Sequence, residues 1–273
     1  MNLTVNHHST YCYTGGKPFD ATKPTVVFIH GVLNDHSVWI LQSRYLAHHG
    51  WNVLAVDLPG HCKSEGDAPA TVEEAAAFIG ALLDAAGVKK AALVGHSWGS
   101  LIALEAAARL KDRVTHLVLV GTAYPMNVSQ VLLDASLHDP EAGIRMINVF
   151  SRSTLAAPPS ALGPGTWVYG ANTALNRRVL RSNPEVNVFH RGFQACDRYA
   201  GGEAAVQALT CPVLFLLGAQ DQMTQPKAAK ALIDQARSHG KAVQVTHLAV
   251  GHHQMTETPE ETLFAIREFL ARP

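Results

Sequence analysis

The sequence lacks an excess of charge of either sign. Its 273 residues include 22 lysines and arginines and 22 aspartates and glutamates, so the formal net charge is zero. A protein that binds a nucleic-acid backbone needs a basic surface to neutralise phosphates. We therefore expect no nucleic-acid partner.

Cysteine is scarce, and long apolar runs are missing. The four cysteines, Cys12, Cys62, Cys196 and Cys211, are spaced too irregularly for a zinc site or a dense disulfide framework. No apolar stretch reaches the length of a membrane span, and the first residues lack the basic flank and apolar core of a signal peptide. We therefore expect reduced thiols, no metal, no membrane association and a cytoplasmic location.

Short β-branched runs alternate with Ala- and Leu-rich runs along most of the chain. The apolar runs are hydrophobic at consecutive positions, which is typical of parallel strands covered on both faces. Helices are expected between them, and the sequences at 71–74 and 258–261 are typical of capping boxes that open two of these helices. The alternation predicts an α/β fold with a mostly parallel, doubly wound sheet. The expected strands are 25–30, 52–57, 91–95, 114–120, 213–217 and 242–247, with weaker antiparallel strands at 3–5 and 11–13.

The alternation stops between residues 124 and 203. This segment has several breaks, such as Asn183-Pro184, and no convincing buried strand. We interpret it as a helical cap inserted between two parts of one core, residues 1–123 and 204–273. Open α/β sheets bind ligands at the carboxyl ends of their strands, so the cap is expected above those ends.

The segment from Gly95 to Gly99 fits the pattern G-x-S-x-G between an expected strand and an expected helix. A sharp strand-to-helix turn exposes the middle side chain, and the two glycines leave room for neighbouring backbone. A glycine-rich turn with a chance serine would contain the same residues. The flanking strand and helix favour Ser97 as a nucleophile.

A serine hydroxyl is a poor nucleophile unless a base takes its proton and an acid orients the base. Asp221 follows one late expected strand, and His252 follows the last one. Alone, the aspartate could be a loop or helix-cap residue and the histidine a surface residue. Together with Ser97 they predict a catalytic triad of Ser97, Asp221 and His252, because they follow one another in the order serine, acid, histidine.

These segments resemble the α/β-hydrolase superfamily over nearly the whole chain, and in particular its serine-nucleophile, esterase-like branch with a helical cap. The segments that carry the resemblance are His30-Gly31, residues 57–61, residues 95–99, residues 218–221 and Gly251-His252.

The resemblance implies further site residues. A histidine motif that includes Glu257 and Pro259 favours His252 over the adjacent His253 as the base. An oxyanion hole is expected from two backbone N–H groups, those of Val32, in the loop after His30-Gly31, and of Trp98.

The sequence departs from the family at Cys62, where glycine is frequent. We interpret Cys62 as a tolerated small residue rather than a reactive thiol, because no second cysteine or charged activator adjoins it in the sequence. Ser97 also argues against the epoxide hydrolases and dehalogenases of this fold, which use an aspartate nucleophile.

The resemblance implies hydrolysis of a small-molecule carboxylic ester through an acyl-enzyme, without a metal or organic cofactor. One alternative is hydrolysis of a carbon–carbon bond in a diketone, or of an enol-lactone, by the same triad. A second alternative, of another class, is a ligand-binding receptor on this fold. The sequence leaves the preferred substrate and the oligomeric state open.

Overall fold

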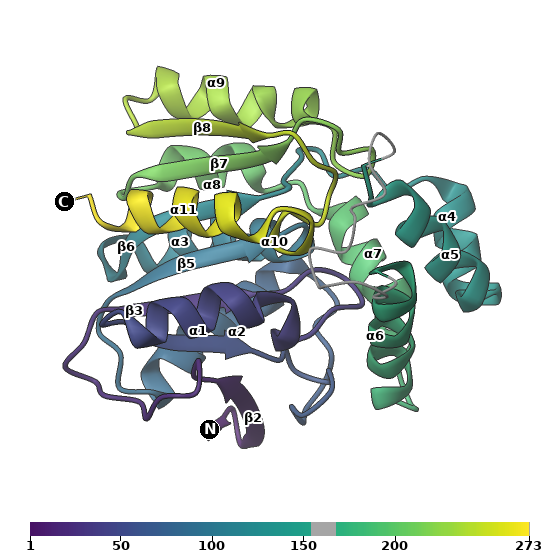
Figure 1. Cartoon of the computed structure of the whole chain (residues 1–273), viewed down its shortest axis with the longest axis horizontal. Coiled ribbons are helices and arrows are strands. Elements are labelled where there is room, and N and C mark those ends of the chain that lie inside the picture. The colour runs from purple at the N-terminus through teal and green to yellow at the C-terminus, as the bar shows by residue number, and fades with distance from the viewer. Residues whose placement is uncertain (154–167, 273) are drawn as a thin grey trace.

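The computed structural model describes residues 1–153 and 168–272. Its described part contains an eight-stranded sheet in the order β1-β2-β4-β3-β5-β6-β7-β8 (Figure 1). Strand β2 runs antiparallel to both of its neighbours, β1 and β4, and the other neighbouring strands run parallel. The strands are β1 (Asn2–Val5), β2 (His8–Tyr13), β3 (Thr25–Ile29), β4 (Asn52–Val56), β5 (Ala91–His96), β6 (Val114–Val120), β7 (Val213–Gly218) and β8 (Val243–Leu248).

The mostly parallel, doubly wound sheet predicted from the sequence is confirmed. Side chains alternate between the two faces of each strand, so neighbouring residues of β3 enter different cores: Val27 and Ile29 enter one, Val26 and Phe28 the other. The prediction that all six parallel strands are covered on both faces is wrong for β8. This strand is half-exposed because it lies at the edge of the sheet.

Helices cover both faces of the sheet. The core that contains Val27 packs against one set of helices, and the core that contains Val26 packs against α1 and α11. The first set is α2 (Val72–Ala85), α3 (Trp98–Leu110), α8 (Gly202–Ala208) and α9 (Lys230–Ser238), and the second is α1 (Ile40–His48) and α11 (Pro259–Leu270). Short helices are η1 (His36–Trp39), η2 (Lys111–Arg113), η3 (Pro226–Ala229) and α10 (Gln254–Glu257).

The two expected helix starts differ in detail. The Thr71 hydroxyl accepts the N–H of Glu74 at 3.1 Å and caps α2 as predicted. Pro259 opens α11, but the Thr258 hydroxyl bonds to the Glu261 carboxylate and caps no backbone N–H. The predicted capping box is therefore wrong at this helix.

Between β6 and α8, the described residues form the helices α4 (Gln130–His138), α5 (Pro140–Phe150), α6 (Val168–Ser182) and α7 (Val188–Arg198). Figure 1 places them together at the end of the sheet where the parallel strands finish. The described part of 124–203 contains helices and no strand, while residues 154–167 of the predicted cap lie outside the described residues. The cap boundaries at 124 and 203 stay a prediction.

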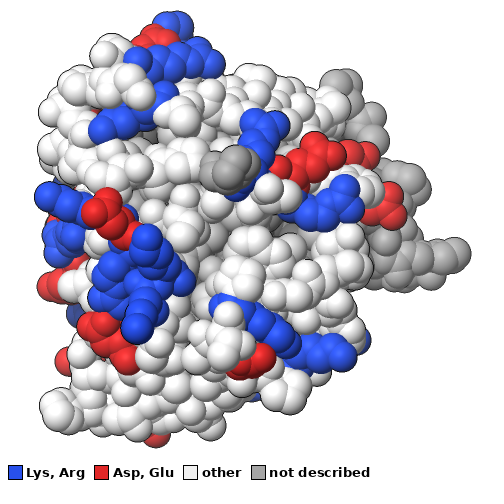
Figure 2. All heavy atoms as spheres, turned by 90° about the vertical axis from the view of Figure 1, so that its left-hand side faces the viewer, with Lys and Arg blue, Asp and Glu red and all other residues white. Residues whose placement is uncertain are grey.

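The surface carries charges of both signs. On the face turned away from α4–α7, basic and acidic side chains lie interspersed among uncharged ones (Figure 2). Within the described ranges, no helix combines the length and the apolarity that a membrane crossing would require.

Candidate active site

Ser97 occupies the turn between β5 and α3 in an unusual backbone conformation. Its φ is 54° and its ψ is −120°, a region that residues other than glycine rarely adopt. The turn is crowded: a Cβ on Gly95 would collide with the backbone of Gly99, and a Cβ on Gly99 would collide with the carbonyl oxygens of Ile29 and His30. The glycines of G-x-S-x-G are therefore required by close backbone approach, as the sequence predicted.

Asp221 and His252 form a hydrogen-bonded pair at the ends of β7 and β8. His252 Nδ1 lies 2.8 Å from Asp221 Oδ2, and both side chains are buried. The other carboxylate oxygen, Oδ1, accepts the N–H groups of Met223 and Thr224 at 2.8 Å each. Burial raises the pKa of Asp221, but the charge and hydrogen bond of His252 and the hydrogen bonds of Thr224 outweigh it, so the pKa lies below its usual value. Asp221 is thus a carboxylate that orients His252.

Thr224 is a site residue that the sequence reasoning missed. Its hydroxyl lies 2.8 Å from Asp221 Oδ2 and 3.0 Å from His252 Nδ1. The sequence could have identified Thr224 by its position three residues after Asp221 in a turn, where side chains often form hydrogen bonds with nearby residues.

The two adjacent histidines lie in different surroundings. The backbone N–H of His252 donates to the carbonyl oxygen of Ser151 at 2.8 Å, and its side chain reaches Asp221. Burial and the nearby charge of Arg152 hold the pKa of His253 well below its usual value, so this ring is neutral. Of these two histidines, only His252 has a carboxylate partner among the described residues, and its role as the base stays a prediction.

His30 holds the loop that follows β3. Its Nδ1 donates to the carbonyl oxygen of Gly31 at 2.9 Å, and its Nε2 accepts the N–H of Leu58 at 3.2 Å. Burial lowers the pKa of His30, which favours this neutral tautomer. His30 therefore does more than terminate a strand: it anchors the expected oxyanion loop.

One of the two expected oxyanion donors, Val32, lies in this loop, and the other, Trp98, opens α3. Val32 lines a small cavity with Ser97, and Trp98 is the first residue of α3, where N–H groups have no partner within the helix. Neither N–H donates to a backbone acceptor among the described residues. Leu33, next to Val32, has a φ of 53°, so the loop is held in a left-handed conformation.

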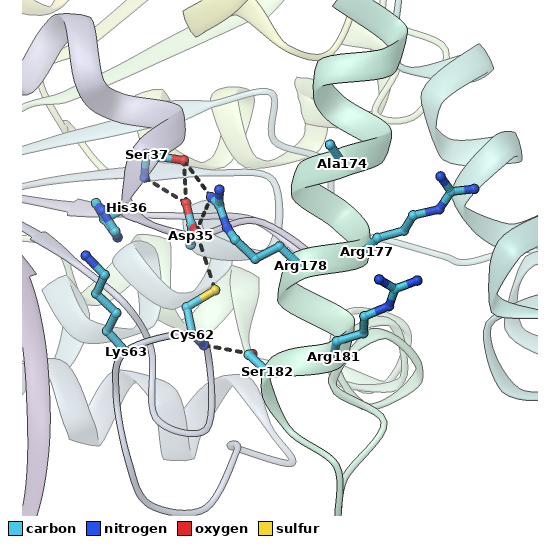
Figure 3. Close-up of a pocket in the computed structure, with 10 residues that line it drawn as sticks. All are labelled: Asp35, His36, Ser37, Cys62, Lys63, Ala174, Arg177, Arg178, Arg181 and Ser182. Carbon is cyan, nitrogen blue, oxygen red and sulfur yellow. Dashed lines mark hydrogen bonds and ion pairs between the residues drawn. The ribbon is translucent and has the colours of Figure 1, made fainter.

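Helix α6 binds this loop. The Asn176 amide donates to the carbonyl oxygen of Leu33 at 2.9 Å, and Arg178 forms a 2.6 Å ion pair with Asp35 (Figure 3). Burial alone would raise the pKa of Asp35, but hydrogen bonds from Ser37 and the charge of Arg178 lower it to about 2. Contacts between residues more than 140 positions apart thus fix the loop that carries Val32.

Cys62 lies beside the same ion pair, on the wall of a cavity of about 830 Å³ between α6 and the core (Figure 3). Its thiol is 3.4 Å from Asp35 Oδ2. Burial and the charges of Asp35 and Asp57 raise the pKa of Cys62 to about 12, so the thiol stays protonated at neutral pH. This is the behaviour of a structural residue and not of an activated nucleophile.

One side-chain group in the described ranges could place three metal-ligand atoms close together: Asp35, His36 and Asp57, within 4.8 Å. The carboxylate oxygens of this group already accept hydrogen bonds: Asp57 accepts from His36, and Asp35 accepts from Arg178. The Arg178 guanidinium also opposes a cation at this place. Hydrogen bonding accounts for the group without an ion.

Ser97 and His252 line two cavities. A cavity of about 280 Å³ has a mostly apolar lining, and a cavity of about 30 Å³ has a more polar lining that includes Val32. The apolar side chains of the larger cavity come from the segment after β6, from α4, α5 and α7, and from the loop after β7: Met126, Val128, Leu132, Met146, Phe150, Phe193 and Met223. The helices of the predicted cap therefore supply much of the wall around Ser97.

Comparisons with known proteins agree with this architecture. Residues 24–255 match a family described as the alpha/beta hydrolase fold. The chain is 37% identical over 120 residues to lipase LipV of Mycobacterium tuberculosis, a match that covers 42% of this chain and 44% of the lipase. It is 25% identical, over 93% of its length and 96% of the relative's, to 2-succinyl-6-hydroxy-2,4-cyclohexadiene-1-carboxylate synthase of Serratia proteamaculans. An esterase from Exiguobacterium antarcticum superposes with a TM-score of 0.81 at 15% identity, covering 100% of this chain and 99% of the esterase, which is a likeness of fold alone.

Proposed function

Because this chain belongs to the alpha/beta hydrolase fold family, we propose that it is a serine hydrolase that cleaves small carboxylic esters. One observation carries the proposal. His252, which is paired with Asp221, and Ser97, in its strained turn, border the same cavity.

Each residue has a role set by its chemistry. Ser97 attacks the acyl carbon while His252 takes its proton, and the same proton later leaves with the alcohol. Asp221 keeps a hydrogen on His252 Nδ1, which leaves Nε2 free as the base, and stabilises the imidazolium. Water then attacks the acyl-enzyme and releases the acid.

The developing oxyanion needs donors that are already in position. The N–H groups of Val32 and Trp98 are suited to this role because they have no other backbone acceptor in the described part of the chain. His30 and Asn176 hold the loop of Val32 from opposite sides, so little reorganisation is needed when the charge forms.

The cavity limits the substrate. We propose that helices α4–α7 form a cap over Ser97, since α4, α5 and α7 contribute side chains to the cavity of about 280 Å³. A closed apolar wall of this kind favours short acyl groups, because each misfitting methylene weakens transition-state binding. The proposed substrates are small uncharged esters, and we propose a cytoplasmic location for the enzyme.

The test is covalent labelling followed by a substrate panel. A fluorophosphonate should add once, peptide mapping should place the adduct on Ser97, and Ser97→Ala should take up no label. The panel compares short esters with an enol-lactone and a vinylogous diketone. An adduct elsewhere would refute the nucleophile. A lactone or diketone that turns over faster than every ester would refute the substrate class, and a single slow turnover would favour a receptor.

A further inference from the structure

The small cavity beside Ser97 has three buried polar atoms that find no hydrogen-bond partner in the described part of the chain. They are Asn34 Oδ1, His96 Nδ1 and His253 Nδ1, and all three residues line this space of about 30 Å³. A polar atom that is buried without a partner destabilises the folded protein, so such atoms are rare and usually have a functional reason. Three of them around one cavity next to the nucleophile indicate a ligand-binding subsite.

The backbone around Asn34 is fixed, whereas its side-chain oxygen Oδ1 has no hydrogen-bond partner among the described residues. Its backbone N–H donates to the carbonyl oxygen of Gly31 at 3.2 Å. The residue before it is fixed by the bond from Asn176 to Leu33, and the residue after it is fixed by the Asp35–Arg178 ion pair. The carboxamide, only 4% exposed as a residue, therefore stays at the cavity wall without being used by the fold. Such preorganisation lowers the entropic cost of binding a polar group there.

The chemistry of two of these atoms, His96 Nδ1 and Asn34 Oδ1, selects the kind of group. His96 Nε2 must donate to the carbonyl oxygen of His252, 2.9 Å away, so Nδ1 of the neutral ring is an acceptor. Burial lowers the pKa of His96 to about 3, which keeps the ring neutral. Asn34 Oδ1 is an acceptor too. The one other asparagine of the lining, Asn176, already accepts from Asn148 and donates to Leu33. The subsite therefore requires a hydrogen-bond donor and disfavours a carboxylate.

We propose that this polar subsite binds a hydroxyl group on the acyl part of the substrate, so that the enzyme prefers hydroxyacyl esters. The inference rests on the proposed esterase function and narrows its substrate class. The size agrees, because the cavity of about 30 Å³ exceeds the roughly 10–15 Å³ that a single water-sized group requires. The position agrees as well, because Ser97 and Val32 border the same space, so a group bound there lies close to the reacting carbonyl.

The test measures kcat/KM for methyl butyrate, its 2-hydroxy and 3-hydroxy derivatives, and the half methyl ester of succinic acid. A hydroxyl that pairs with buried acceptors should favour at least one hydroxy ester over butyrate by about tenfold, with the succinate half ester slowest. Asn34→Leu keeps the shape and removes the acceptor, so the ratio of hydroxy ester to butyrate should fall to about one. Asn127→Leu changes an asparagine of the larger, apolar cavity and should leave the ratio unaltered.

The outcomes distinguish a failure of the hydroxyl subsite from a failure of the proposed esterase function. If butyrate is cleaved but no hydroxy ester is preferred, the subsite holds water only and the inference is wrong. A preference that survives Asn34→Leu, or a faster succinate half ester, also overturns it. If the wild-type protein cleaves no ester at all, the proposed function itself is refuted. Fluorophosphonate labelling of Ser97 in Asn34→Leu checks that a lost ratio does not come from misfolding.

Discussion

The orienting role proposed for Asp221 predicts how far kcat should fall when this residue is replaced by asparagine. In Asp221→Asn, the amide oxygen can still accept the N–H groups of Met223 and Thr224, so the loop keeps its shape. The amide nitrogen then takes the place of Oδ2, which faces His252 Nδ1 at 2.8 Å. Two donors cannot face each other, so the imidazole must carry its hydrogen on Nε2. A ring with hydrogen on Nε2 cannot take the proton of Ser97.

The wrong tautomer should lower kcat by roughly 10³–10⁴, or about 4–5.5 kcal/mol of transition-state stabilisation. Thr224→Val is the matched control, because it removes a hydroxyl bound to the same carboxylate oxygen and leaves the tautomer unchanged. The loss of one hydrogen bond should lower kcat about tenfold.

The assay is kcat on a short ester for both variants, with thermal unfolding as a check of folding. A rate for Asp221→Asn within a few-fold of wild type would mean that another carboxylate orients the base. Equal losses in the two variants would mean that the tautomer is not the cause.

Three further predictions follow from the site. His252→Ala should abolish ester turnover and His253→Ala should reduce it modestly, since of the two only His252 bonds to a carboxylate. Steady-state kinetics of both variants check this, and the reverse result would mean that His253 is the base. The pKa of Asp35 falls from 3.8 to about 2 on folding, so this group stabilises the fold above pH 4 and loses that effect as the pH falls towards 2. Asp35→Asn should therefore lower the free energy of unfolding by up to about 2 kcal/mol at pH 7 and by less at pH 3, measured by urea titration, and a difference independent of pH would contradict this origin. Among unsubstituted acyl esters, kcat/KM should be highest for chains of about two to six carbons, and a maximum at long chains would indicate a lipase.

Local patterns in the sequence determined the main elements and the turn of the site. Runs of consecutive apolar residues identified the six parallel strands, with ends that differ from the observed ones by a residue or less. The glycines around Ser97 were informative because their cause is steric: Gly95 makes room for the backbone of Gly99 within the turn. The close approach of Gly99 to the end of β3 comes from the tertiary structure. The same local view misjudged Thr258, whose hydroxyl had two possible partners, and β8, whose composition does not show that it is an edge strand.

The sequence placed Ser97, Asp221 and His252 after their strands, because strand ends can be read from hydrophobic runs. Tertiary structure alone decided which groups bond and which remain free. The partner of Asp35 is Arg178, 143 residues away, and no spacing in the chain predicts that pair. The unpaired side-chain oxygen of Asn34 was equally unpredictable, because an atom is recognised as unpaired only once every neighbour that packs around it in the described structure is in place. Hydrophobic pattern and backbone sterics act over a few residues, whereas hydrogen-bond partners depend on segments that meet only when the chain has folded.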